Sequence, residues 1–154
     1  MLAAGAGEAF AGVDKGDRAP ELSGLRDAAG KAVSLRALRG KVVVVTFGAS
    51  WCAPCKKELP VLDALAKRYT RGKVAFIAVN IDSDKAKGQR FMHGLGIGHM
   101  RAAYDPQKRA VRIYDPPAMP TIFVIGKHGI VREIHKGYRS GDEKSIAKVI
   151  SSLL

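Results

Sequence analysis

Apolar and polar residues along this chain follow two periods, which predict strands and helices in a regular order. Residues 42–47 form a largely apolar, β-branched run, and residues 73–81 form a second one. Such runs are typical of strands that are buried on both faces of a parallel sheet. Between them, apolar residues recur at helical spacing from residue 52 to residue 69, which predicts an amphipathic helix. Strand, helix and strand in this order predict a right-handed βαβ unit.

The segments on either side of this unit add shorter elements. Upstream, turn residues separate two short runs, which predicts an antiparallel hairpin of residues 21–25 and 31–35, followed by a helical turn over residues 35–38 that Ser34 can cap. Downstream we expect a helix capped by residues 82–84 and ending near His93, a strand at 102–104, a helix at 107–114, a strand at 121–125, a turn at 126–129, a strand at 130–136, and a helix from the capping box Ser140–Glu143 to Leu154. The last two strands are expected to be antiparallel.

The length of 154 residues suits a single domain that folds without covalent staples. We expect a flexible N-terminal segment at residues 1–15 and one folded domain at residues 16–154. No apolar run approaches the roughly 20 residues that a membrane-spanning helix needs. Ala9–Ala11 resembles the cleavage site of an export signal, but Glu8 interrupts any apolar region before it. An intact export signal is therefore not expected, and a trimmed signal and an expression remnant both fit this segment.

The charge balance is strongly basic, with 26 Lys and Arg against 14 Asp and Glu and a net charge of +12. These cations are scattered along the chain, whereas a nucleic-acid-binding surface would need a clustered basic stripe with aromatic residues between. Only 6% of residues are aromatic. Nucleic acid is therefore not expected as a partner, and acidic proteins or anionic membrane surfaces suit the charge better.

The two cysteines, Cys52 and Cys55, carry the strongest chemical signal. Cys52 lies where the predicted helix begins, and the unpaired N–H groups and the dipole of a helix start stabilise an anion. A free thiol has a pKa near ~8.5, which at such positions can fall to about 7 or lower. Cys52 is therefore predicted to be a nucleophilic thiolate, and Cys55, one turn later, the resolving thiol of a redox-active disulfide.

A purely structural role explains this cysteine pair less well. A disulfide that closes so short a loop constrains the unfolded chain little. A structural zinc site would need a second pair of ligands, and the chain has no further cysteine. No metal and no cofactor other than the Cys52–Cys55 disulfide itself is expected.

Several short motifs together resemble one family. They are Ala19-Pro20, Val33-Ser34-Leu35, Leu38-Arg39-Gly40-Lys41, Ala49-Ser50-Trp51-Cys52 and Met119-Pro120-Thr121. With the WCxPC sequence, they resemble thioredoxin-like thiol:disulfide oxidoreductases of the TlpA/ResA/CcmG group over residues 16–154. The resemblance implies an α/β thioredoxin fold, a central mixed sheet flanked by helices, with the N-terminal β-hairpin as an extension. Pro60 resembles the proline that kinks the active-site helix in this family.

The same resemblance implies a surface that binds clients around the cysteines. It assigns a cis peptide bond to Pro120 and places Met119, Pro120 and Thr121 opposite the CxxC. The chain around Met119 would then present backbone groups to an extended client strand and align its disulfide with Cys52. Trp51 and Pro54 would contact the client from the CxxC side.

The chain departs from the family pattern at two positions. Thioredoxins carry a buried acid at the position of Thr46, which cannot take up a proton. We expect Glu58, one helical turn after Cys55 and on the same helix face, to be the base for Cys55, although a plain surface glutamate also fits. Gly48 stands where the family often has tryptophan, so the surface beside the cysteines is expected to differ.

The activity that the resemblance implies is reduction of protein disulfides outside the cytoplasm. The clients would be apocytochrome c or the thiols of a copper site, and a membrane protein would supply the electrons. The protein is expected to be periplasmic or otherwise extracytoplasmic, and to be a monomer.

Two other functions stay open at this level. Met92, His93, His99 and Met100 surround a glycine-rich turn and are soft ligands suited to copper, so a copper-delivery protein is one alternative. The other is a noncatalytic docking module in which the cysteines have lost their role.

Overall fold

The computed structural model of this chain describes residues 12–69 and 71–154. Residues 1–11, most of the segment expected to be flexible, lie outside the described residues. Val13 donates its N–H to the Tyr114 carbonyl at 3.3 Å and packs against the buried core. The described chain therefore packs on the domain from about its second residue onward.

Six strands, four α-helices and one 3-10 turn follow one another in the described chain. They are β1 (Arg26–Asp27), the 3-10 turn η1 (Arg36–Leu38), β2 (Val42–Gly48), α1 (Ala53–Lys67), β3 (Val74–Asn80), α2 (Lys85–Gly94), β4 (Arg101–Tyr104), α3 (Arg109–Tyr114), β5 (Thr121–Ile125), β6 (Val131–Lys136) and α4 (Asp142–Leu153). From η1 onward the element order agrees with the prediction from the sequence, and the βαβ unit is β2–α1–β3.

The strands form one mixed sheet in the order β1-β4-β3-β2-β5-β6. Strands β2, β3 and β4 are parallel, whereas β5 is antiparallel to β2, β6 to β5, and β1 to β4. This is the mixed sheet of the thioredoxin fold, as predicted, and β2 lies inside it with a partner on each side.

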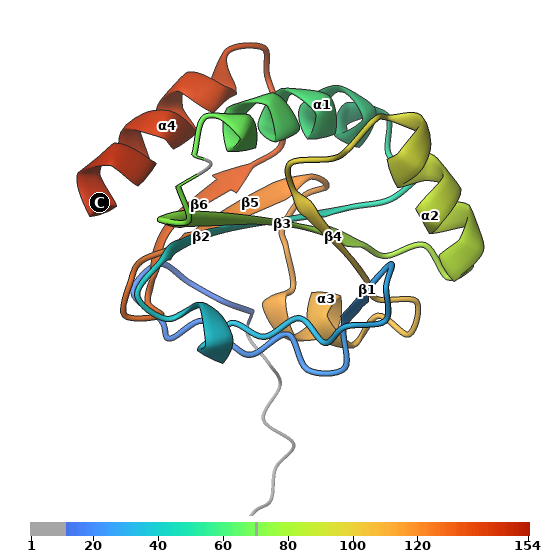
Figure 1. The fold of residues 1–154 in the computed structure, drawn as a ribbon, viewed down its shortest axis with the longest axis horizontal. Coiled ribbons are helices and arrows are strands. Elements are labelled where there is room, and N and C mark those ends of the chain that lie inside the picture. Colours follow the sequence, from blue (N-terminus) through green and yellow to red (C-terminus); the bar gives the residue numbers. More distant parts are fainter. Residues whose placement is uncertain (1–11, 70) are drawn as a thin grey trace, which may run out of the picture.

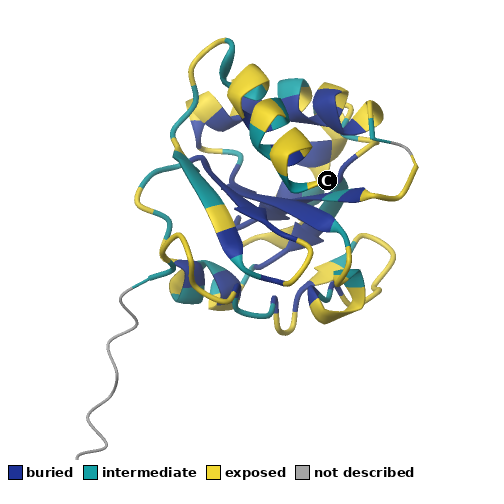
Figure 2. Cartoon of the chain, turned by 90° about the vertical axis from the view of Figure 1, so that its left-hand side faces the viewer, coloured by how far each residue is buried: buried dark blue, intermediate teal, exposed yellow. Residues whose placement is uncertain are grey.

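Helices cover both faces of the sheet (Figure 1). Helices α1, α2 and α4 lie on one face, and α3 lies on the other with η1 and the N-terminal loops. Alternate residues of β2 face alternate layers. Val42 and Val44 belong to the apolar cluster under α1, and Val43, Val45 and Phe47 to the opposite cluster. In Figure 2 the central strands of the sheet are buried, whereas the edge strand β6 is mostly intermediate or exposed and the helices expose their outer surfaces.

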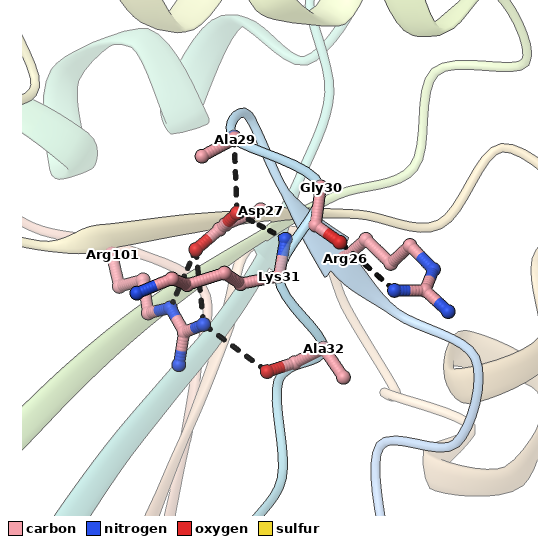
Figure 3. Close-up of polar contacts among 7 residues, drawn as sticks. All are labelled: Arg26, Asp27, Ala29, Gly30, Lys31, Ala32 and Arg101. Carbon is pink, nitrogen blue, oxygen red and sulfur yellow. Dashed lines mark hydrogen bonds and ion pairs between the residues drawn. The ribbon is translucent and has the colours of Figure 1, made fainter.

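The predicted N-terminal hairpin is present, and Val33 donates its N–H to the Leu25 carbonyl at 3.0 Å, but the first arm extends to residues 26–27. Arg26 pairs with Ala32, and residues 26–27 also pair with β4. Asp27 stabilises this arrangement, because its carboxylate accepts the N–H groups of Ala29 and Lys31 in the turn and both Nε and Nη2 of Arg101 on β4 (Figure 3). The prediction of a strand at residues 21–25 is wrong: Glu21 instead accepts three backbone N–H groups, from Leu22, Leu35 and Arg36.

Two predicted helix starts are also wrong. The capping box at Ser140 does not form, because Gly141, with φ +96°, precedes the first helical residue and no side chain caps α4. Asp142 instead accepts the N–H of Arg139 and pairs with His135. Helix α3 begins at Arg109 rather than residue 107, since Asp105 accepts the N–H of Arg109.

Candidate active site

Cys52 and Cys55 form a disulfide at the start of α1, with 5.3 Å between their Cα atoms. Cys52 is the N-cap residue, and its Sγ accepts the backbone N–H of Cys55 at 3.2 Å. Strand β2 delivers Cys52 to this point through the turn at Ala49–Trp51, and Pro54 lies in the first turn of α1, where a missing N–H costs nothing. The sequence thus placed Cys52 correctly at a helix N-terminus.

The two ends of the CxxC face different surroundings. Trp51 is 61% exposed and is one of two exposed large hydrophobic side chains in the described chain. Pro54 is also exposed. Cys55 is fully buried between α1 and β2. Cys52 is 5% exposed, so the small accessible part of the pair belongs to Cys52, next to the exposed Trp51.

Met119 and Pro120 lie beside the same end of β2. The Met119–Pro120 peptide bond is cis. Because Thr121 pairs with Phe47, the residues before β5 lie level with the end of β2 that leads to Cys52. Thr121 is buried and its hydroxyl donates to the Ala118 carbonyl at 2.6 Å, which closes the loop around the proline.

Glu58 is buried on the face of α1 that packs against β2. Thr46 donates its hydroxyl to Glu58 Oε1 at 2.8 Å, and Oε2 accepts no hydrogen bond from the described residues. Burial raises the pKa of Glu58 to about 8, although the Thr46 hydrogen bond opposes the rise. Glu58 is therefore a buried acid that titrates near neutral pH, and it is not a surface glutamate.

Gly48 lies on the same face of β2 as Thr46 and directly opposite Cys55. A Cβ atom at Gly48 would lie 3.1 Å from Cys55 Sγ and 3.3 Å from Cys55 Cβ. Real Cβ atoms seldom approach so closely, so α1 and β2 pack against each other here because residue 48 has no side chain. Thr46 and Glu58 fill the next layer of this interface.

A second acid at the site, Asp82, was expected only to cap α2. Asp84 is the N-cap of that helix, whereas Asp82 is buried and binds the active-site turn. It accepts the Ser50 N–H at 2.9 Å and the Ser50 hydroxyl at 2.7 Å. The signal in the sequence was position: Asp82 follows β3 at the sheet edge where β2 also ends.

Tyr138 follows β6 at the same end of the sheet. Partial burial is the main cause that raises the pKa of Tyr138, and the nearby carboxylates of Glu143, Asp142 and Glu58 raise it further. Sequence reasoning missed this neighbour of Glu58, because β6 and α1 are far apart along the chain.

The histidine and methionine pairs do not share one environment. Met92 and Met100 are buried in the core, whereas His93 and His99 are exposed. Met92, His93 and Met100 line an open groove of about 690 Å³, and His99 does not. Within residues 12–69 and 71–154, no three His, Cys, Asp or Glu side chains are grouped as a metal site.

Asp63 on α1 fixes the turn between these pairs. Its carboxylate accepts the N–H groups of Gly98, His99 and Met100 at 2.7 to 3.3 Å. One side-chain carboxylate thus holds the backbone of this turn. The described helices include none that is both long and apolar enough to cross a bilayer.

Comparisons with known proteins agree with this geometry. The Redoxin family profile matches residues 14–150. The thiol-disulfide oxidoreductase ResA of Bacillus subtilis is 33% identical over 131 residues, which cover 83% of this chain and 72% of ResA. The thioredoxin-like protein YneN of the same organism is 29% identical over 127 residues, which cover 82% of this chain and 74% of YneN.

A solved structure is similar over nearly its whole length. It is a proposed thiol:disulfide interchange protein DsbE from Chlorobium tepidum, with a TM-score of 0.84 and 31% identity over 92% of this chain and 98% of that one. The disulfide at the start of α1 and the relatives named for thiol–disulfide exchange identify the activity as that of a thiol:disulfide oxidoreductase. The chain therefore belongs to the Redoxin family, as a thioredoxin-like protein of the TlpA/ResA/CcmG type.

Proposed function

We propose that this protein reduces disulfides in partner proteins outside the cytoplasm, with Cys52 as the attacking thiol and Cys55 as the resolving thiol. The observation that carries the proposal is the asymmetry of the pair. Cys52 caps α1 beside the exposed Trp51, and Cys55 is sealed between α1 and Gly48. A client disulfide can reach Cys52, while Cys55 can reach only Cys52.

In the first step, the Cys52 thiolate attacks one sulfur of the client disulfide. A bond forms between Cys52 Sγ and that sulfur, and the other client sulfur leaves as a thiolate that takes a proton from water. The N-cap position favours this chemistry because the helix start stabilises the thiolate before attack.

In the second step, Cys55 loses its proton and attacks Cys52 Sγ. The Cys52–Cys55 disulfide forms, and the second client sulfur leaves as a thiolate. Glu58, one turn from Cys55 on the same helix face, would accept the proton on its unpaired Oε2. Its pKa of about 8 in the disulfide form is close to the ordinary pKa of a thiol, about 8.5, so the ionised carboxylate can take the Cys55 proton at little cost in free energy.

The client chain would lie along Met119, beside the cis-proline loop and Trp51. Within the described residues, neither the N–H nor the carbonyl of Met119 forms a hydrogen bond. These groups are therefore available to pair with an extended client segment, as in strand addition at a sheet edge. Pro54, which is exposed, would contact the client directly. Thr121, which is buried, would support this surface through its hydrogen bond within the cis-proline loop.

The proposed setting follows the family resemblance. The clients would be apocytochrome c or the thiols of a copper site, the protein would act as a monomer, and a membrane protein would return electrons to Cys52–Cys55. The relatives named as thiol-disulfide oxidoreductases support exchange chemistry as such.

Two cysteine variants test the mechanism. Cys52→Ser should abolish insulin reduction, whereas Cys55→Ser should still attack and should accumulate a mixed disulfide that is visible by mass spectrometry. Reversed behaviour, with the mixed disulfide on Cys55, would contradict the assignment. The reduction potential decides the direction: a value near that of thioredoxin, about −270 mV, supports a reductant, and a value near that of DsbA, about −120 mV, indicates an oxidant.

A further inference from the structure

We propose that Asp82 is a positioning residue for the exchange reaction, because its carboxylate holds the turn that presents Trp51 and Cys52 to the client. The inference rests on the proposed role of Cys52 as the attacking thiol. It adds a part of the machinery that comes from a separate element, the loop between β3 and α2.

The contacts between Asp82 and the turn involve both oxygens of the carboxylate. Oδ2 accepts the Ser50 N–H at 2.9 Å and Oδ1 accepts the Ser50 hydroxyl at 2.7 Å. Ser50 lies two residues before Cys52, and Cys52 donates its own N–H to the Ala49 carbonyl at 3.1 Å. A shift of Ser50 would therefore move both the N-cap cysteine and Trp51 between them.

Asp82 is itself fixed by its neighbours. Asn80 donates its amide to Asp82 Oδ2 at 2.9 Å and accepts the Asp82 N–H at 3.1 Å. Asn80 is in turn pressed against α2, since a Cβ at Gly88 would lie 2.1 Å from Asn80 Oδ1. The chain of contacts from Gly88 through Asn80 and Asp82 to Ser50 is continuous, and Asn80 and Asp82 are both buried.

Every group that contacts the carboxylate donates a hydrogen bond. Burial by itself raises the pKa of Asp82, but the Ser50 and Asn80 hydrogen bonds and the charge of Lys87 hold it below its usual range. The carboxylate is therefore ionised at neutral pH. A buried carboxylate with three donors is a rigid support, because each donor fixes its direction.

Two substitutions at Asp82 separate positioning from charge. Asp82→Asn removes the charge but can keep the contacts: its oxygen can accept the Ser50 N–H, and its amide can donate to the Ser50 hydroxyl, which is also an acceptor. Asp82→Ala removes the charge and all three hydrogen bonds. Ser50→Ala removes one of the two contacts to the turn and serves as a milder variant if Asp82→Ala does not fold.

The single tryptophan, Trp51, reports on the turn directly. We expect Asp82→Ala to lower the fluorescence anisotropy of Trp51 and to lower kcat/KM for a protein disulfide by about 10- to 100-fold. For Ser50→Ala, both the anisotropy and kcat/KM should lie between those of Asp82→Ala and the parent. For Asp82→Asn, both should be near the parent values. Unchanged anisotropy and rate in Asp82→Ala, or equal losses in Asp82→Asn and Asp82→Ala, would overturn the proposal.

The same measurement is independent of the cysteine assignment. Cys52→Ser alone and Cys52→Ser combined with Asp82→Ala should still differ in the fluorescence anisotropy of Trp51, although neither protein performs exchange. A persistent difference with an active Cys52→Ser protein would refute the proposed function and leave the positioning of the turn intact. No difference in either background would refute the positioning role alone.

Discussion

The two faces of β2 share one backbone but contact layers of different composition. One face presents Val43, Val45 and Phe47 to a purely apolar layer, where Phe47 packs edge-on against Phe123 at 5.8 Å between ring centroids. On the other face, Thr46 contacts Glu58 of α1 and Gly48 lies against Cys55 of α1. The first face is built for stability, whereas the second holds a buried carboxyl and a close contact that stability alone would not require.

This contrast shows how the fold supports a reactive pair. A strand with a partner on each side and an aromatic layer behind it cannot move easily, so α1 and its cysteines rest on a rigid base. The chemistry is then confined to one layer between β2 and α1. Changes on the two faces should therefore affect stability and reduction potential differently, and four substitutions test this difference.

The largest loss of stability is expected from the apolar face. Phe47 is fully buried, and Phe47→Ala should lower the free energy of unfolding by about 3–5 kcal/mol. Denaturant unfolding at neutral pH measures this loss. The reduction potential of the folded variant should stay at the parent value, because no group that contacts the cysteines changes. A shift in potential as large as that of a Gly48 variant would show that the two faces are not independent.

The next effect comes from Glu58 and depends on pH. Its pKa is about 8 in the folded protein and 4.5 in the unfolded chain, so the folded state holds one more proton between these values. The free energy of unfolding should therefore decrease as pH rises from about 4.5 to 8, by up to about 1.4 kcal/mol per pH unit from this group. Glu58→Gln should abolish this decrease with pH, so the variant should become more stable than the parent toward pH 8.

Two further measurements check the role of this carboxyl. Thr46→Val removes the hydrogen bond that opposes the raised pKa, so the decline should extend to higher pH. Glu58→Gln should also slow release of the mixed disulfide and alter its pH dependence. A Glu58→Gln protein whose stability difference from the parent is flat between pH 5 and 8 would show that Glu58 is ionised in the fold.

The smallest effect is expected at Gly48. Gly48→Ala places a methyl group against Cys55 Sγ and should lower the free energy of unfolding of the disulfide form by about 1–3 kcal/mol. If that cost falls on the disulfide form, the reduction potential should rise by about 20–60 mV. Gly94→Ala in α2 is the matched control, since a Cβ there meets no atom within 4 Å. Equal effects of both substitutions would exclude a specific contact with Cys55.

Local chemistry explains what could be predicted. The valine run, the helical spacing after Cys52 and the turn residues after Ile125 act within a few residues of each other, so their elements appeared where expected. Glu58 could be assigned to the face of Cys55 for the same reason. The errors at residues 21–25 and at Ser140 arose where a distant backbone N–H or a positive φ replaced the expected local contact.

The sequence by itself determined that Cys52 begins a helix after a buried strand and that Cys55 and Glu58 share a face of it, because these relations depend on periodicity along one segment. Only the tertiary structure decided that Thr46 would pair with Glu58, that Gly48 would lie against Cys55 and that Asp82 would hold Ser50. These contacts join residues 7 to 32 positions apart in sequence, and their partners are chosen by strand order and helix packing rather than by spacing along the chain.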